Sequence, residues 1–230
     1  MSVVICYNTN DLSLVVTDTR ITSSNGYYTD NNQKLFNLPI GWCAGVGAGG
    51  FLDAVKDKLL ETNINTERDI INIYNEVYNN YNNNIYTKEQ IDMSALILSY
   101  LANNKFKTVL LNNKWINANK YIYTNNYVNI AEPIELIKEE FLLNDYKKNF
   151  PLIEIKYKHI AIKQTFKIFN YMSYNCRSVS KIYDVGIMYL NNNNIYKCRF
   201  TGNIEKIVSK SYKKIRKNNN NSIYKISDYY

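Results

Sequence analysis

The chain has little of what many catalytic and metal sites require. It contains one histidine, His159, and its four cysteines are scattered with no Cys-x-x-Cys pair. A single histidine without a ligand-spaced partner argues against a histidine-dependent triad and against a histidine metal site. Scattered cysteines are typical of proteins in a reduced compartment, so we expect a cytoplasmic location. We also expect no metal or organic cofactor.

Long hydrophobic runs are also missing. The longest nearly apolar stretch covers residues 95–102, whereas a membrane helix needs about 20 residues. The first residues show no basic segment followed by a long apolar one, so we expect neither a signal peptide nor a membrane partner. Hydrophobic residues still make up 46% of the 230 residues, which excludes a disordered chain. No linker or repeat divides the sequence, and we predict one domain over residues 1–202.

The formal net charge is +8, and the basic excess is concentrated near the C-terminus. Residues 206–217 hold most of it, and four asparagines follow at 218–221. Such a run is compatible with nucleic acid or an acidic protein surface as a partner. Charge alone specifies little, however, so we interpret residues 203–230 as a solvated basic tail rich in Asn and Tyr. Nucleic-acid binding through this tail stays the alternative from another functional class.

Alternating and apolar segments predict an order of strands, two helices, strands, two helices and strands. The expected hairpins are 2–7 with 12–17, 34–36 with 41–46, 95–101 with 107–111, and 182–190 with 195–200. The expected helices are 51–60, 66–77, 133–147 and 158–176. This order does not alternate as a parallel sheet would. It favours an α+β fold in which two antiparallel sheets stack and helices cover both outer faces, a four-layer αββα sandwich.

The most informative residues are Ser2, Asp18 and Lys34, which stand at separations of 16 and 16. If Met1 is removed, Ser2 becomes a terminal hydroxyl residue that carries its own free amine, and that amine can act as its base. A nearby lysine ammonium disfavours the protonated amine and so lowers its pKa. An aspartate can neutralise and orient that lysine. The alternative for these residues is an ordinary ion-pair cluster.

The chain resembles the proteasome-like N-terminal-nucleophile hydrolases, which include proteasome β subunits and bacterial proteasome-like peptidases. Four segments within the first 60 residues carry the resemblance: SVVI from Ser2, VVTDTR from Val15, QKLF from Gln33, and GVGAGGFLDA from Gly45. It implies a peptidase or amidase that acts on peptide or protein substrates. It also implies a homo-oligomeric ring or stack, with or without an ATPase partner.

The resemblance assigns roles to seven residues. It implies that Ser2 is the nucleophile, supported by Asp18 and Lys34, and that Gly49 supplies the oxyanion N–H, although counting forward from Lys34 gives Ala48. It also implies that substrate binds as an added strand by main-chain bonds, with contacts at three positions: Arg20, Thr22 and Gly47.

The second half departs from the family pattern. The family has a serine-containing turn before its third helix, whereas residues 127–133 contain no serine. It also has an Asp and a Ser near the end of its fourth helix, where this chain offers Ser178 or Ser180 but no Asp. A catalytically silent assembly or regulatory subunit is therefore the first alternative.

Two further patterns have simpler interpretations. Gly45-x-Gly47-x-x-Gly50 matches a dinucleotide-binding fingerprint, but that motif needs a strand–helix–strand unit with parallel strands. Cys6 shares strand parity with Ser2, although a buried strand cysteine is the more common case.

Overall fold

The computed structural model describes residues 2–22, 27–81, 85–113, 122–123, 126–191 and 194–206. Met1 and the basic residues after Lys206 lie outside this described part, as do the predictions that concern them. No helix among the described residues is long and apolar enough to cross a lipid bilayer.

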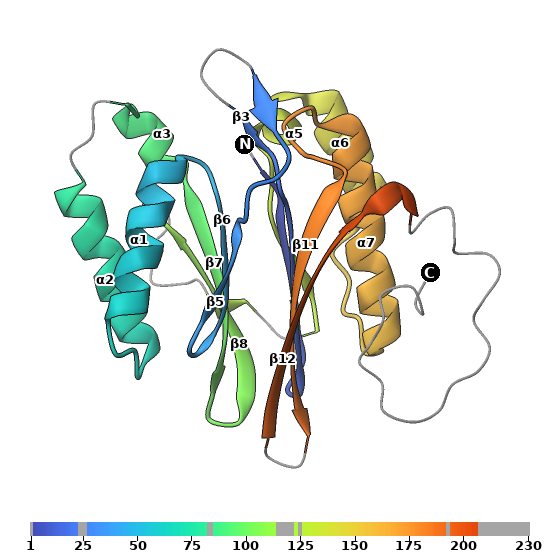
Figure 1. The fold of residues 1–230 in the computed structure, drawn as a ribbon. Coiled ribbons are helices and arrows are strands. Elements are labelled where there is room, and N and C mark those ends of the chain that lie inside the picture. Colours follow the sequence, from blue (N-terminus) through green and yellow to red (C-terminus); the bar gives the residue numbers. More distant parts are fainter. Residues whose placement is uncertain are drawn as a thin grey trace.

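The fold is mixed α+β and contains two five-stranded antiparallel sheets (Figure 1). The first sheet has the order β10-β1-β2-β11-β12. Its strands are β1 (Val4–Asn8), β2 (Leu12–Asp18), β10 (Val128–Ala131), β11 (Ile182–Asn191) and β12 (Asn194–Asn203). The second sheet has the order β5-β6-β7-β8-β9. Its strands are β5 (Leu35–Leu38), β6 (Gly41–Val46), β7 (Ala95–Ala102), β8 (Lys105–Asn112) and β9 (Ile122–Tyr123).

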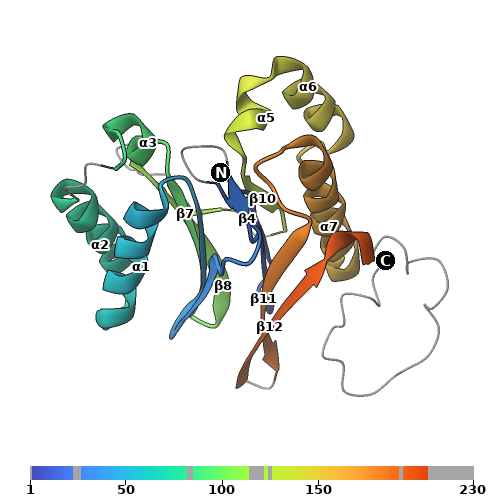
Figure 2. The ribbon, with the colours of Figure 1, turned by 45° about the horizontal axis from the view of Figure 1, so that its top comes forward.

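A two-stranded ribbon and six helices complete the described elements. The ribbon pairs β3 (Ile21–Thr22) with β4 (Tyr28–Thr29). The helices beside the second sheet are α1 (Gly49–Glu61), α2 (Glu67–Asn80) and α3 (Lys88–Asp92). Those beside the first sheet are α5 (Ile134–Lys138), α6 (Glu140–Asn149) and α7 (Lys158–Asn175). The turned view in Figure 2 shows the two helix groups on opposite sides of the strands in that direction as well.

Alternate residues of β1 belong to different apolar clusters, which explains why this strand is apolar throughout. Ile5 and Tyr7 pack with α7 residues such as Phe166. Val4 and Cys6 join residues of the second sheet in another cluster, which includes Trp42, Ile97 and Leu110. A third cluster packs the second sheet against α1 and α2. Strand β1 is therefore buried on both faces.

Local signals explain several boundaries. The predicted start of α2 is confirmed, because Thr66 and Asp69 form a reciprocal capping box. Asn103 and Asn104 turn β7 into β8 with φ angles of 52° and 57°, a region that asparagine tolerates better than most residues. Each of the four predicted hairpins is present, with strand ends that differ by a few residues.

The single helix predicted over 133–147 is wrong. The helix is interrupted at Glu139, which has an extended backbone and separates α5 from α6. In one continuous helix, Leu136 and Leu142 would lie about 120° apart around the axis. The break allows both side chains to be buried in the same cluster.

The structure also bears on one disfavoured alternative and on one expected boundary. The dinucleotide interpretation is wrong, because β6 pairs antiparallel with both β5 and β7 and no strand–helix–strand unit with parallel strands surrounds the glycines. The packed chain reaches beyond residue 202, since β12 ends at Asn203 and Ile204 is fully buried in the cluster beneath α7.

Candidate active site

Ser2, Asp18 and Lys34 meet at one point, although they come from both sheets. In the β1–β2 hairpin Val4 lies opposite Thr17, which brings the start of the chain beside the end of β2. Lys34 immediately precedes β5, whose first residue Leu35 packs in the cluster shared by the two sheets. The β1–β2 hairpin therefore brings Ser2 close to Asp18, and the packing of the two sheets brings Lys34 to both.

The Lys34 ammonium connects the other two side chains. Its Nζ donates a short hydrogen bond to Ser2 Oγ and lies 3.0 Å from Asp18 Oδ2. The side chain of Lys34 is only 10% exposed and that of Asp18 is fully buried. Burial lowers the pKa of Lys34, while Asp18 acts in the opposite direction and favours the charged form. The contact thus places a proton donor directly on the hydroxyl of Ser2.

Backbone N–H groups hold the Asp18 carboxylate. Val3 N–H donates to Oδ1 at 3.1 Å, and Arg20 N–H donates to Oδ2 at 2.8 Å. Ser180 N–H lies 3.4 Å from the same Oδ2. These donors satisfy the buried carboxylate and fix its orientation.

Ser180 is the second-half serine that reaches this cluster. Its Oγ accepts from Thr19 N–H at 3.3 Å and donates to the Ile182 carbonyl at 2.7 Å. Ser178 is bound elsewhere, since its hydroxyl lies 2.6 Å from Glu135 Oε2. The sequence left both serines open, and only the fold places Ser180 on Asp18.

Arg20 and Thr22 lie on the β3 side of the site. The Arg20 guanidinium binds both Asp30 oxygens, at 2.6 and 2.8 Å, and a third nitrogen contacts the Arg177 carbonyl at 2.5 Å. Asp30 accordingly raises the pKa of Arg20. Thr22 is exposed at the end of β3. In this structure Arg20 fastens the β3–β4 ribbon, and each of its three guanidinium nitrogens donates one hydrogen bond to the protein.

The glycine turn between β6 and α1 holds the predicted oxyanion donor. Figure 1 shows the start of α1 and the N-terminus at the same end of the sheets. Gly47 has a φ of +121°, and Gly49 is the first residue of α1. Ala48 N–H donates to Ser94 Oγ at 2.9 Å, and Gly50 N–H points to Tyr86 OH at 3.4 Å. Gly49 N–H has no acceptor among the described residues, which favours Gly49 over Ala48 as an available donor. Sequence reasoning did not single out Ser94 or Tyr86, since neither lies near the glycine motif in the chain.

Two other predicted candidates lie away from this cluster. Cys6 Sγ packs between the sheets 3.2 Å from Thr108 Oγ1, and burial raises its pKa to about 12, so the thiol stays protonated. His159 is exposed at the start of α7 beside the Tyr157 ring. Within the described part of the chain, neither residue forms a hydrogen bond or ring contact with Ser2.

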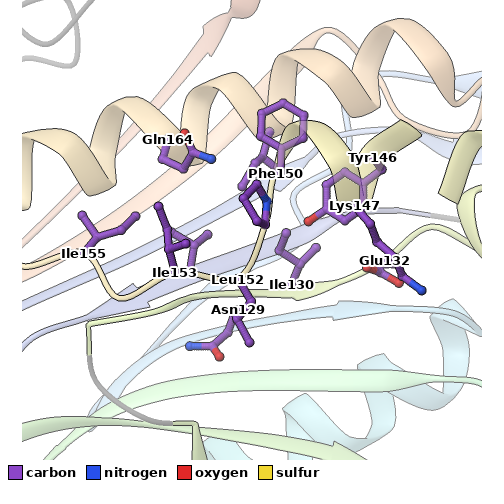
Figure 3. A pocket seen from close by; sticks show the side chains of 13 residues that line it. Asn129, Ile130, Glu132, Tyr146, Lys147, Phe150, Leu152, Ile153, Ile155 and Gln164 are labelled. Carbon is purple, nitrogen blue, oxygen red and sulfur yellow. The ribbon is translucent and has the colours of Figure 1, made fainter. Parts of the chain in front are cut away.

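A separate groove of about 370 Å³ lies between β10, α6 and α7 (Figure 3). Ile130, Phe150 and Ile153 supply apolar walls, and Glu132 and Lys147 lie at one end. Its lining does not include Ser2, Asp18 or Lys34. This groove is therefore separate from these three residues, and their chemistry identifies the candidate active site.

No known family profile matches the chain, and no curated protein sequence matches it. The fold is similar to that of a solved structure, the Anbu (Gly-1) mutant from Hyphomicrobium sp. strain MC1, with a TM-score of 0.61. The match covers 86% of this chain and 88% of that chain at 10% sequence identity. At this identity the likeness concerns the fold alone.

Proposed function

We propose that this protein is an N-terminal-nucleophile hydrolase of the proteasome-like type, a peptidase or amidase that uses Ser2 after Met1 is removed. The observation that carries the proposal is the buried Lys34 ammonium, which contacts Ser2 Oγ and Asp18 at once. An ion pair formed only for stability would not need the hydroxyl of the second residue as its third member.

The fold supports the same proposal. Anbu is proteasome-like, and the likeness extends over most of both chains. We propose that the architecture is the four-layer αββα sandwich of that class. The apolar cluster shared by the two sheets and the two clusters beneath the helices support this arrangement.

The reaction would proceed through an acyl-enzyme. The neutral α-amine of Ser2 takes the Oγ proton while Oγ bonds to the substrate carbonyl carbon, and the carbonyl oxygen becomes an oxyanion that Gly49 N–H binds. The C–N bond then breaks, and the leaving amine takes the proton from the α-amine. Water repeats the sequence on the ester, which releases the acid and returns the proton to Oγ.

Lys34 would have two effects in this reaction. Its positive charge lowers the pKa of the α-amine, which raises the neutral fraction near pH 7. Its Nζ–H donor stabilises negative charge as it develops on Ser2 Oγ. Asp18 would keep the ammonium in place, and Ser180 would help to fix Asp18.

Substrate would add as an extended strand between Thr22 and the segment from Gly47 to Gly49, by main-chain hydrogen bonds. Arg20 would support this site by fastening the β3–β4 ribbon through Asp30. We propose peptides or proteins as substrates, no cofactor, a cytoplasmic location and a homo-oligomer. The oligomer rests on the resemblance to proteasome-like proteins, which also leaves an ATPase partner open.

A catalytically silent subunit is the second candidate, because the usual second-half Asp is missing. The contact of Ser180 N–H with Asp18 argues against it, since a supporting donor occupies this place. Nucleic-acid binding through the basic tail depends on residues outside the described part. The salt dependence of oligonucleotide binding by the full chain would reveal it.

Ser2→Ala and Lys34→Ala test the proposed function. We expect each variant to fold and to lose at least about 10³-fold in hydrolysis of a panel of fluorogenic peptide amides. The double variant should lose no more than either single one, because the two residues act as a unit. Hydrolysis that survives at the wild-type rate in Ser2→Ala would refute the assignment.

A further inference from the structure

The turn from β6 into α1 needs an external support if Gly49 N–H is to face a reacting carbonyl. Its residues lie between a strand and the first hydrogen-bonded turn of a helix, where N–H groups have no partner within the helix. The first backbone hydrogen bond within α1 runs from Leu52 N–H to the Ala48 carbonyl. Groups outside the helix therefore decide the orientation of the amides at Ala48, Gly49 and Gly50.

Ser94 fixes the amide on one side of Gly49. It is fully buried just before β7, and its Oγ accepts from Ala48 N–H at 2.9 Å. The same hydroxyl donates to the Gln90 carbonyl at 2.8 Å, so its proton is committed and its lone pair faces Ala48. The Ser94 carbonyl is held in turn by Asn112 Nδ2 at 3.0 Å. The acceptor is thus rigid before any substrate arrives.

Gly47 makes this close approach possible. A Cβ at position 47 would lie 2.4 Å from Ser94 Oγ and 2.6 Å from Ser94 Cα, which no side chain can tolerate. Its φ of +121° also lies in a region that favours glycine. The glycine therefore serves the contact between the turn and Ser94.

Tyr86 lies on the other side of Gly49. Its hydroxyl oxygen is 3.4 Å from Gly50 N and 3.7 Å from the position of a Cβ on Gly49. Tyr86 and Ser94 flank the short helix α3, so one segment supplies an acceptor for each amide that borders Gly49.

We propose that Ser94 is a positioning residue for the oxyanion donor, assisted by Tyr86. Ser94 holds the Ala48 N–H and Tyr86 holds the Gly50 N–H, so the intervening Gly49 N–H keeps one direction without an acceptor among the described residues. This inference rests on the proposed function, because it assigns the support of the proposed oxyanion site. A rigid donor costs no reorganisation when charge develops, and a misplacement of about 1 Å can cost about 10²-fold in rate.

The test compares Ser94→Ala with Ser99→Ala. Ser99 is also buried, lies on β7 and makes hydrogen bonds of its own, to Ser13 and Asn8, but it does not contact the turn. Both variants lose a buried hydroxyl, so a purely structural effect should appear in both. The readout is the rate at which a β-lactone probe acylates Ser2, followed by intact mass over a range of probe concentrations.

We expect Ser94→Ala to lower the maximal acylation rate by about 10- to 100-fold with little change in the half-saturating probe concentration. Ser99→Ala should stay within about threefold of wild type, and Tyr86→Phe should show a smaller loss than Ser94→Ala. A folded Ser94→Ala that acylates at the wild-type rate overturns the inference. If Ser94→Ala does not fold, Tyr86→Phe decides, and a wild-type rate in that variant overturns the two-sided support.

Periodate separates this outcome from failure of the proposed function. It cleaves an N-terminal serine with a free amine to an aldehyde and needs no oxyanion site. If wild type reacts with periodate but not with the lactone, the proposed function fails and the inference falls with it. If wild type reacts with both and Ser94→Ala also reacts with both at wild-type rates, only the inference fails.

Discussion

At the scale of single residues, the burial of the Lys34–Asp18 ion pair requires an explanation. Two charges removed from water lose much of their solvation, and their mutual attraction often does no more than offset that loss. Here the ammonium is also directed at Ser2 Oγ. We infer that the pair is retained for reactivity at Ser2 rather than for stability of the fold.

The pH dependence of acylation follows from these groups. The rate should rise with pH as the α-amine of Ser2 loses its proton. Because the Lys34 ammonium lowers the pKa of this amine, the rise should occur at a pH below the ordinary pKa of about 8. It should fall again when Lys34 loses the proton that it donates to Oγ. Burial lowers the pKa of Lys34, so this alkaline limb should lie below its ordinary value of 10.5.

The Asp18→Asn variant tests in which direction Asp18 shifts the pKa of Lys34. Asp18 raises the pKa of Lys34, so its neutralisation should move the alkaline limb of the remaining activity to lower pH. Acylation rates measured from pH 5 to 11 would show the shift. An alkaline limb that stays in place or moves upward in Asp18→Asn contradicts this role of Lys34.

At the scale of elements, the two glycines of the turn should respond differently to alanine. Gly47→Ala meets both a positive φ and the Ser94 contact, so it should destabilise the fold by about 1–3 kcal/mol and lower the Tm by at least about 2 °C. Gly49→Ala has open space around its Cβ apart from Tyr86 OH at 3.7 Å. It keeps the N–H, so it should retain both stability and acylation.

Thermal unfolding and lactone acylation of the two variants provide the measurement. Equal losses in Gly47→Ala and Gly49→Ala would show that the turn does not have the conformation described here.

The same scale shows what the sequence could predict. Hairpins and capped helices follow from local rules, and these rules located β1, β2, α2 and β11. The short helix α3 was missed although Thr87 and Gln90 form a capping box, because the helix has only five residues. The break at Glu139 had no glycine or proline to signal it and depends on tertiary packing.

The residues of the candidate site also fall into those that the sequence predicts and those that only the fold brings together. Ser2, Asp18 and Lys34 were predicted from the resemblance to proteasome-like hydrolases together with their residue types, and the structure brings them together. Ser94 and Tyr86 could not be predicted, because they are far from the turn in the sequence. They reach it only in the folded chain, where β6 pairs with β7. Ser180 was one of two candidates until β11 placed its backbone beside Asp18.

At the scale of the whole molecule, α5 and α6 leave apolar side chains uncovered. Leu136 and Leu142 are buried, whereas Ile137 is 53% exposed and Phe141 is 86% exposed. Exposed apolar side chains of this kind often mark an interface. We expect Phe141→Asp to dissociate a homo-oligomer while the fold stays intact, because its side chain is outside the core.

Leu60→Asp is the matched control, since Leu60 is a half-exposed residue on α1, on the other side of the molecule. Sedimentation velocity of wild type and both variants would test the interface. Dissociation by Leu60→Asp alone, or by neither variant of an oligomeric wild type, would place the interface elsewhere.

The central claim is that Ser2 is the terminal nucleophile of the mature protein. The most direct measurement is the mass of the N-terminal peptide before and after reaction with the lactone probe. The account predicts that Met1 is absent, that the Ser2 amine is free, and that one acyl group is bound to Ser2. Retention of Met1 or acetylation of Ser2 throughout, or an adduct on another residue, would contradict the account.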